Sequence, residues 1–311
     1  MNILVTGGAG FIGSNIADAY LAAGHEVYIV DNFSTGDIAN VPKDAKLYEM
    51  DIRDEKFGDV LRENKIDVIN HHAAQIDVRR SVDDPKNDLS INVLGTLNIL
   101  EASVRAGVKR FIFASTGGAI YGEQEYFPAD ELHPTAPMSP YGITKLCVEK
   151  YLHYYHLVKK LEYTVFRYTN VFGPRQSPHG EAGVVAIFCH KFLRGENPVI
   201  NGDGLQTRDF VYVEDVVRAN VLALTMRDTD TLNVCTQRET DINEIFKILN
   251  RAYGERAVET HAPAKEGEQQ RSVCSFKKIQ TRLDWTPKIS IEEGLKRTAD
   301  FFQRRYSGEK K

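Results

Sequence analysis

A tyrosine and a lysine stand four residues apart in the run Tyr-Gly-Ile-Thr-Lys, at Tyr141 and Lys145. On a helix this spacing puts both side chains on one face. A free phenol has a pKa of about 10 and is a poor base at neutral pH. A fixed positive charge beside it favours the phenolate, which can take a proton from a hydroxyl group. The pair therefore indicates a general base, with a simple surface Tyr–Lys pair as the alternative.

Two hydroxyl groups, those of Ser115 and Thr116, follow an apolar run of the sequence. A hydroxyl at the carboxyl end of a strand can hydrogen-bond a reacting oxygen and assist proton transfer. In a turn, the same hydroxyls bond to their own backbone instead. The residues by themselves favour neither interpretation.

Three glycines, Gly7, Gly10 and Gly13, follow the first β-rich run directly and open a helical stretch. A tight turn and a close approach of backbone to a pyrophosphate both require residues without a Cβ. The helix N-terminus then offers N–H groups and a partial positive charge to the phosphates. In this strand–turn–helix context the glycines predict a dinucleotide site, although their spacing is GxxGxxG, and a turn without a ligand is the alternative.

Asp31 ends the second β-rich run, 18 residues beyond Gly13. A carboxylate there can accept hydrogen bonds from both ribose hydroxyls of NAD and would repel the 2′-phosphate of NADP. No arginine adjoins Asp31 in the sequence to receive a 2′-phosphate. The sequence therefore predicts NAD as the cofactor.

The elements that must position these residues alternate between β-rich runs and helical stretches, as βαβ units do. The predicted strands are Asn2–Thr6, Glu26–Val30, Lys46–Glu49, Asp67–Asn70, Arg110–Ser115 and Tyr163–Arg167. The predicted helices between them are Phe11–Ala23, Asp54–Asn64, Lys86–Ala106 and Pro140–Lys160. Six strands on this rhythm predict an α/β fold with a doubly wound parallel sheet of the Rossmann type, over residues 1–170.

Beyond Asn170 the rhythm changes, and glycine-containing loops separate the helical stretches. The predicted helices here are Gly183–Arg194, Val213–Met226, Asp241–Ala252 and Ile291–Arg305. We expect residues 171–311 to form mainly a smaller substrate-binding lobe, with some segments returning to the first domain.

The overall composition excludes several classes of protein. The net charge of −4 gives no general attraction to nucleic acid or to an anionic membrane. No apolar run approaches the roughly 20 residues that span a bilayer, and the N-terminus does not resemble a signal peptide. The four cysteines contain no CxxC pair, and the nine histidines show no metal-ligand spacing. We therefore expect a cytoplasmic protein without a metal or a disulfide.

Together these motifs resemble the extended short-chain dehydrogenase/reductase family and, within it, the UDP-sugar 4-epimerases. The likeness runs through nearly the whole chain. Besides the glycine loop, its motifs are Asp31-Asn32, Asp51-Ile52, His72-Ala73-Ala74, Asn92-Val93-Leu94-Gly95-Thr96, Ser139-Pro140-Tyr141-Gly142, Arg167–Arg175, Gly202-Asp203-Gly204, Arg208-Asp209-Phe210-Val211 and Leu283–Pro287.

The resemblance implies a UDP-glucose 4-epimerase activity, in which UDP-glucose and UDP-galactose interconvert through a transient 4-keto sugar and bound NAD. Tyr141 would be the base, Lys145 would hold the nicotinamide ribose, and Thr116 would assist at O4. Asn170 and Arg208 would contact the diphosphate of the substrate. The implied NAD contacts, besides Tyr141 and Lys145, are Gly7, Gly10, Phe11, Ile12, Gly13, Asp31, Asn32, Asp51, Ile52, Ala73, Ala74 and Asn92.

The resemblance also implies a homodimer, formed through the helices of residues 86–106 and 140–160.

Three departures from the family pattern leave alternatives open. The stretch from Ser115 to Gly122 is one residue longer than usual, so the assisting hydroxyl is either Thr116 or Ser115. Lys265 stands where many relatives have arginine, which keeps a positive charge for the diphosphate but loses the bidentate fork. Ser272 falls at the position that gates N-acetyl access in these epimerases. A small residue there leaves UDP-GlcNAc and UDP-GalNAc as further substrates.

Other reactions on this fold are alternatives of different weight. Sugar-nucleotide 4,6-dehydratases usually carry an Asp-Glu pair after the catalytic threonine, where this chain has Gly117-Gly118. A UDP-glucuronate 4-epimerase remains an alternative, as does another NAD-dependent enzyme that modifies sugar nucleotides. A non-catalytic nucleotide-sensing protein on this fold would be expected to lose Tyr141 or Lys145, and the chain retains both.

Overall fold

The computed structural model describes residues 1–179, 183–264, 267 and 269–306, and it divides into two compact units. The first unit comprises Met1–Gly122, Thr135–Tyr168 and Val217–Leu232. The second comprises Glu123–Pro134, Thr169–Val216 and Asn233–Lys311. Each unit is thus assembled from stretches that are far apart in the sequence.

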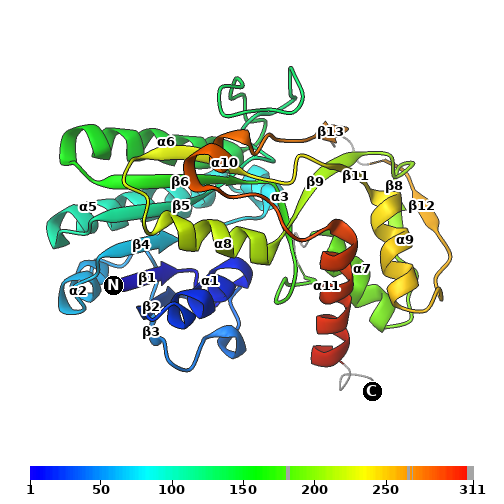
Figure 1. Ribbon diagram of the computed structural model, residues 1–311, viewed down its shortest axis with the longest axis horizontal. Coiled ribbons are helices and arrows are strands. Elements are labelled where there is room, and N and C mark those ends of the chain that lie inside the picture. Colours follow the sequence, from blue (N-terminus) through cyan, green and yellow to red (C-terminus); the bar gives the residue numbers. More distant parts are fainter. Residues whose placement is uncertain (180–182, 265–266, 268, 307–311) are drawn as a thin grey trace. The chain divides into compact units, whose positions relative to one another are not determined.

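The first unit is built on a seven-stranded sheet in the order β10-β6-β5-β4-β1-β2-β3 (Figure 1). Every pairing among β1 to β6 is parallel, which confirms the predicted doubly wound α/β fold. The strands are β1 (Asn2–Thr6), β2 (Glu26–Asp31), β3 (Lys46–Glu49), β4 (Val68–His71), β5 (Arg110–Thr116), β6 (Glu162–Tyr168) and β10 (Asp230–Val234).

The six predicted strands are all present, and their bounds agree within two residues. Their central positions form continuous apolar runs, such as Ile3 to Val5, because a parallel sheet is buried on both faces. The seventh strand, β10, was not predicted. Its sequence, Asp-Thr-Leu-Asn-Val, contains residues that are depleted in strands, and its pairing beside β6 defines it instead.

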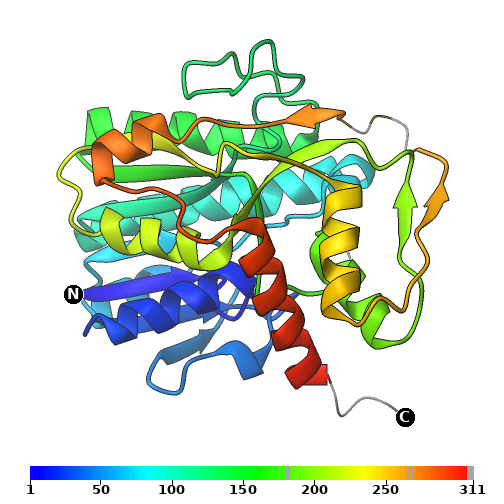
Figure 2. The same cartoon turned by 45° about the vertical axis from the view of Figure 1, so that its right-hand side comes forward.

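Helices cover both faces of this sheet. On one face, α2 (Phe57–Glu63), α5 (Thr96–Ala106) and α6 (Pro140–Lys159) share a hydrophobic core with the strands, and α5 and α6 contact one another. On the other face, α1 (Phe11–Ala22) lies next to the end of α8 (Val213–Ala223), since the Tyr20 hydroxyl donates to the backbone oxygen of Asn220 at 3.3 Å. The same layering is seen after a turn of the view (Figure 2).

The predicted helix Lys86–Ala106 is interrupted. It consists of α4 (Pro85–Leu89), a π-helical turn, η2 (Ser90–Gly95), and α5. Such turns are rare and often lie at functional sites. A period of hydrophobic residues does not distinguish a π turn from an α-helix, so the sequence could not reveal it. The helix α6 begins as predicted, because Pro140 occupies its first turn and the Ser139 hydroxyl caps the backbone N–H of Gly142.

The second unit contains a four-stranded sheet with the order β11-β9-β13, in which β7 also pairs with β9. Its strands are β7 (Asn170–Phe172), β9 (Thr207–Tyr212), β11 (Glu239–Asp241) and β13 (Arg271–Ser272). A separate pair consists of β8 (Val199–Asn201) and β12 (Thr260–Ala262). The sequence predicted none of these strands, because most of them span only two or three residues and depend on their partners.

The helices of the second unit are α7 (Val184–Leu193), α9 (Ile242–Ala252), α10 (Lys277–Leu283) and α11 (Ile291–Tyr306). Three of them match the predicted stretches within one or two residues, and α10 was not predicted. They enclose a second core that includes Phe172, Phe246, Leu295 and Phe302. Among the described residues, no helix is long and apolar enough to cross a membrane.

Candidate cofactor and catalytic site

The loop after β1 places the glycines against neighbouring backbone. Gly7 has a φ of +67°, and a Cβ there would lie 2.7 Å from the backbone nitrogen of Ala73. A Cβ on Gly13 would lie 2.3 Å from the carbonyl oxygen of Gly7. The N-cap residue of the 12-residue helix α1 is Gly10, which makes no side-chain hydrogen bond to the first N–H groups, those of Phe11 and Ile12 included. This bare helix N-terminus fits a pyrophosphate.

Asp31 closes the glycine loop at the end of β2. Its carboxylate is buried and accepts hydrogen bonds from the backbone N–H of Ala9, at 2.9 Å, and of Phe33, at 2.8 Å. A carboxylate has about four acceptor positions, so these two bonds leave capacity for ribose hydroxyls. The loop that follows β4 carries Ala73 and Ala74, and the N–H of Ala73 donates to the Thr6 hydroxyl at 3.2 Å.

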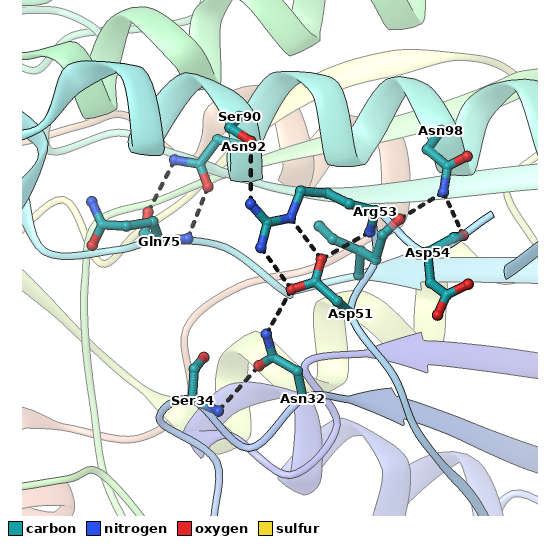
Figure 3. A network of polar contacts seen from close by, with 10 residues as sticks. Asn32, Ser34, Asp51, Arg53, Asp54, Gln75, Ser90, Asn92 and Asn98 are labelled. Carbon is teal, nitrogen blue, oxygen red and sulfur yellow. Dashed lines mark hydrogen bonds and ion pairs between the residues drawn. The ribbon is translucent and has the colours of Figure 1, made fainter. Parts of the chain in front are cut away.

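A polar network extends from β2 toward the π turn (Figure 3). Asn32 donates to Asp51 at 3.0 Å, and the Arg53 guanidinium binds both oxygens of Asp51, at 2.8 and 2.9 Å. These bonds to Arg53 hold the pKa of Asp51 at about 2. Arg53 also donates to the hydroxyl of Ser90, at 3.2 Å. Asp51 and Asn32, both predicted cofactor contacts, are therefore brought together beside the π turn.

The π turn is also fixed to the loop that follows β4. Asn92 is buried, accepts from the backbone N–H of Gln75 at 2.8 Å and donates to the carbonyl oxygen of the same residue at 3.0 Å (Figure 3). Ile52 is held similarly, because Asn98 donates to its carbonyl oxygen at 2.8 Å. The predicted NAD contacts Ile52, Ala73, Ala74 and Asn92 thus lie on segments of the chain that are connected by hydrogen bonds.

The predicted base and its partner lie on α6. The ammonium of Lys145 is buried, donates to the carbonyl oxygen of Ala114 at 2.8 Å and lies 5.8 Å from the centroid of the Tyr141 ring. Tyr141 is half-buried, and its hydroxyl makes no hydrogen bond within the described part of the chain. A phenol and an ammonium are therefore held beside the end of β5, and the phenol has a free hydroxyl group.

Burial and neighbouring carboxylates determine the electrostatics of this pair in the chain alone. Burial lowers the pKa of Lys145 to about 8, while Asp88 and Glu149 act in the opposite direction. Burial raises the pKa of Tyr141 well above that of a free phenol, and the charge of Asp88 raises it further. In the chain on its own, the pKa of Tyr141 is therefore raised, because burial and the charge of Asp88 both disfavour the phenolate.

The two candidate hydroxyls at the end of β5 have different surroundings. Ser115 is buried and donates to Glu149 on α6 at 2.6 Å. Glu149 also forms a bidentate ion pair with Arg167 on β6, at 2.7 and 3.0 Å, and Arg167 donates to the Tyr121 hydroxyl. The hydroxyl of Thr116 is half-buried and has no such bond in the described residues. The geometry thus leaves Thr116 available and Ser115 occupied.

In the second unit, the predicted substrate residues lie on strands that pair with β9. Ser272 of β13 is buried and stands opposite Arg208 of β9, and Asn170 of β7 stands opposite Phe210. The sheet therefore brings three of the four residues to adjacent strands. The fourth, Lys265, lies outside the described residues.

The next residue of β9 is a structural anchor. Asp209 is buried and accepts bonds from the backbone and hydroxyl of Thr236 and from the N–H groups of Gln237 and Cys274, at 2.7–3.3 Å. Burial raises its pKa to about 6. These contacts fix the strand that carries Arg208.

Comparison with known proteins decides the family. Residues 3–235 match the model of the NAD dependent epimerase/dehydratase family, which is more than half of the chain. The chain belongs to this family.

Three UDP-glucose 4-epimerases are similar to this chain over nearly its whole length. The UDP-glucose 4-epimerase of Thermotoga maritima, solved with UDP-glucose, is 46% identical with a TM-score of 0.96, covering 98% of this chain and 99% of its own. That of Thermus thermophilus, solved with NAD, is 42% identical with a TM-score of 0.92, covering 97% and 99%. The UDP-glucose 4-epimerase of Mycolicibacterium smegmatis is 40% identical over 309 residues, covering 97% of this chain and 99% of its own.

Four charged residues in and around the candidate site were not singled out from the sequence: Arg53, Asp88, Glu149 and Arg167. A signal existed for two of them. Glu149 continues the face of α6 that carries Lys145, four residues further along. Arg167 is a charge within a buried strand, which requires a partner. The sequence offers no comparable signal for Arg53, whose contact with Asp51 depends on the conformation of a loop.

The buried ion pair between Arg167 and Glu149 predicts a loss of stability. Arg167→Met keeps the length of the side chain but leaves the carboxylate of Glu149 buried without its cation. We expect unfolding in urea, followed by circular dichroism, to show a loss of about 3–5 kcal/mol. The matched control is Arg194→Met, which breaks an exposed pair with Glu196 at 2.7 Å and should change stability by less than about 1 kcal/mol. Equal losses in the two variants would contradict this account.

Proposed function

We propose that this chain is a UDP-glucose 4-epimerase, which interconverts UDP-glucose and UDP-galactose through a transient 4-keto sugar. The observation that carries the proposal is the buried ammonium of Lys145 beside Tyr141, on the helix that packs against the strand ending in Thr116. A base and an assisting hydroxyl are thereby presented in the unit that also contains the glycine loop. The named relatives support the same activity.

The residues of the first unit fit NAD. Gly7 and Gly13 leave a space that a Cβ would fill, and Asp31 retains acceptor positions for ribose hydroxyls. The network of Asn32, Asp51 and Ile52 would border the adenine. Lys145 would hold the nicotinamide ribose, and the loop with Ala73 and Ala74, which Asn92 fixes, would line the remaining side. When bound, NAD supplies the acceptor and later the donor of the hydrogen at C4 of the sugar.

The side chains of the first unit then handle the proton. Tyr141 takes the proton of the 4-hydroxyl group, while Lys145 stabilises the phenolate and Thr116 hydrogen-bonds O4. The 4-keto sugar turns about its diphosphate link and presents its other face. Tyr141 returns the same proton to O4, and the configuration at C4 is inverted. The pKa of Tyr141 is raised in the chain alone, so the positive charge of an oxidised nicotinamide would be needed to form the phenolate.

The second unit would hold the nucleotide part of the substrate. Asn170 and Arg208, on paired strands around β9, would contact the diphosphate, with Lys265 adding a positive charge. Binding energy taken from the uridine and the diphosphate leaves the sugar free to turn. The small side chain of Ser272 leaves room for an acetamido group, which makes UDP-GlcNAc and UDP-GalNAc further substrates to be tested.

We place this enzyme in the cytoplasm, since all four of its cysteines are free.

Tyr141→Phe should remove the base without disturbing the helix. We expect wild-type protein to convert UDP-galactose to UDP-glucose, resolved by chromatography, and the variant to lose at least about 100-fold in kcat. The matched control is Tyr48→Phe, which removes a hydroxyl bonded to Asn64 at the edge strand β3 and should keep its activity. No conversion by the wild type, even with NAD supplied, would overturn the proposal, as would near-normal activity of Tyr141→Phe.

Removing each of the two hydroxyl groups at the end of β5 should have a different effect on the enzyme. Thr116→Val should lower kcat about 10- to 100-fold, because it removes the available hydroxyl beside the reacting oxygen. Ser115→Ala should mainly reduce thermal stability, because it removes a donor to the buried Glu149. The measurements are steady-state kinetics and thermal unfolding of both variants. A larger loss of kcat in Ser115→Ala would assign the catalytic role to Ser115.

The outer face of α6 supports a homodimer. Several of its apolar side chains are exposed, among them Tyr154 at 49%, Leu157 at 55% and Val158 at 54%. The neighbouring η2 exposes Leu94 at 52%, and α6 contacts η2 and α5. Contiguous exposed apolar side chains mark interaction surfaces. The helices of residues 86–106 and 140–160 are therefore the proposed interface between two copies.

Leu157→Glu should break this dimer, because it would bury an unpaired charge in the interface. Light scattering on a size-exclusion column should give twice the mass of one chain for the wild type and one chain for the variant. Val258→Glu changes an exposed side chain in the second unit and should leave the mass unchanged. A wild-type mass of one chain would exclude the homodimer.

A further inference from the structure

Arg53 connects the segment after β3 to the π turn, and the proposed reaction assigns it no role. Its guanidinium donates to both oxygens of Asp51, from Nε at 2.8 Å and from Nη2 at 2.9 Å (Figure 3). The Nη1 atom donates to the Ser90 hydroxyl of η2 at 3.2 Å. The side chain of Arg53 is 40% exposed, so these partners, and not burial, determine where the guanidinium lies.

The acceptor positions of Asp51 are filled mainly by Arg53. A carboxylate has about four such positions. One oxygen accepts from the backbone N–H of Arg53, at 2.9 Å, and from its Nε, and the other accepts from Nη2 and from the side-chain amide of Asn32, at 3.0 Å. Asn32 is exposed, and its own oxygen accepts from the backbone N–H of Ser34 at 3.1 Å. Its amide is therefore the donor that can leave Asp51 without disturbing the contacts of Arg53.

Contacts other than those of the guanidinium fix the backbone of this segment. Asn98 on α5 donates to the carbonyl oxygen of Ile52 at 2.8 Å. Gly95 of η2 lies against the same segment, since a Cβ there would be 2.7 Å from the side chain of Ile52 and 3.4 Å from the Cγ atom of Arg53. Loss of the guanidinium would therefore leave the segment in place, but the carboxylate of Asp51 would keep only the backbone N–H as a donor from residue 53.

We infer that Arg53 is a positioning residue for the cofactor: it holds the carboxylate of Asp51 in one orientation, so that the acceptor position occupied by Asn32 can pass to the amino group of adenine. The inference rests on the proposed NAD site and deepens it. Adenine carries an amino donor on its edge, and a bond from such a donor to a charged acceptor is a strong one. Hypoxanthine carries a carbonyl oxygen in the same place, which a carboxylate repels. A fixed carboxylate therefore distinguishes the two bases better than one that can rotate.

Arg53→Met removes the three side-chain donors, keeps an aliphatic stem against Gly95 and retains the backbone N–H. Arg53→Lys keeps the charge but loses the planar fork that binds both oxygens of a carboxylate. The matched control is Arg62→Met, which breaks an exposed ion pair with Asp59 on α2 of the same unit.

The first measurement is the rate at which bound NAD is released. Holoenzyme is mixed with an excess of isotopically labelled NAD, and the label taken up by the protein is followed by gel filtration. We expect release to be at least about 5-fold faster in Arg53→Met than in the wild type and in Arg62→Met, with Arg53→Lys between them. Equal rates in all of these proteins would overturn the inference.

The second measurement separates orientation of Asp51 from a merely structural role. Each holoenzyme is exchanged to equilibrium in an equimolar excess of NAD and nicotinamide hypoxanthine dinucleotide, and the bound dinucleotides are then released and resolved by chromatography. The wild type and Arg62→Met should prefer NAD, and Arg53→Met should lower this preference at least about 5-fold. A structural role alone would weaken the binding of both dinucleotides equally, so an unchanged preference in Arg53→Met would overturn the inference, as would a wild type without preference. Arg53→Lys, which should lie between, replaces Arg53→Met if that variant does not fold.

Neither measurement contains a UDP-sugar, so their outcome is separate from that of the epimerase assay. A protein that gives both expected results but epimerises no UDP-sugar would support the inference and reject only the proposed substrate.

Discussion

The candidate site depends first on the attachment of α6 to the end of β5. Two contacts make this attachment, from the Lys145 ammonium to the carbonyl oxygen of Ala114 and from the Ser115 hydroxyl to Glu149. They lie four residues apart on one face of the helix, so they fix both its height along the strand and its rotation. The position of Tyr141, one turn before Lys145, follows from them. Arg167, on the next strand, neutralises the buried carboxylate of Glu149. This pairing lowers the free-energy cost of burying the charge in a low-dielectric core.

A second set of contacts joins the loops of the candidate cofactor site to the same sheet. His71 bonds the Thr6 hydroxyl of β1 at 2.6 Å and the Thr96 hydroxyl at the start of α5 at 2.9 Å. Thr6 in turn accepts from the backbone N–H of Ala73, so the loops after β1 and β4 are linked. This link joins the two loops where Gly7 and Ala73 lie so close that a Cβ on Gly7 would be 2.7 Å from the Ala73 nitrogen. Neutral histidine provides it without adding a charge.

The sequence predicted the parts of this structure that have local signals. Six strands of the first sheet, the glycine loop and the start of α6 depend on apolar runs, on missing Cβ atoms and on a Ser-Pro cap, which short stretches of chain display. The seventh strand and the short strands around β9 have no such signal, since pairing with distant segments defines them. The same distinction applies to the site. Spacing predicts that Tyr141 and Lys145 share a face, but only the fold shows that Ser115 is occupied by Glu149 and that Asp88 binds the hydroxyl of Thr144.

The electrostatic environment of Tyr141 depends on more than the lysine four residues further along. A nearby cation favours the phenolate, whereas in the chain alone burial and the charge of Asp88 on α4 raise the pKa of Tyr141. A permanently ionised base would abstract a proton in either direction of the reaction without distinction. A phenol that ionises only beside a cation can instead give the proton back once that cation is gone. The cofactor has the same redox state before and after the whole reaction. A base whose pKa is raised in the absence of a cation therefore suits this reaction better than a permanently ionised one.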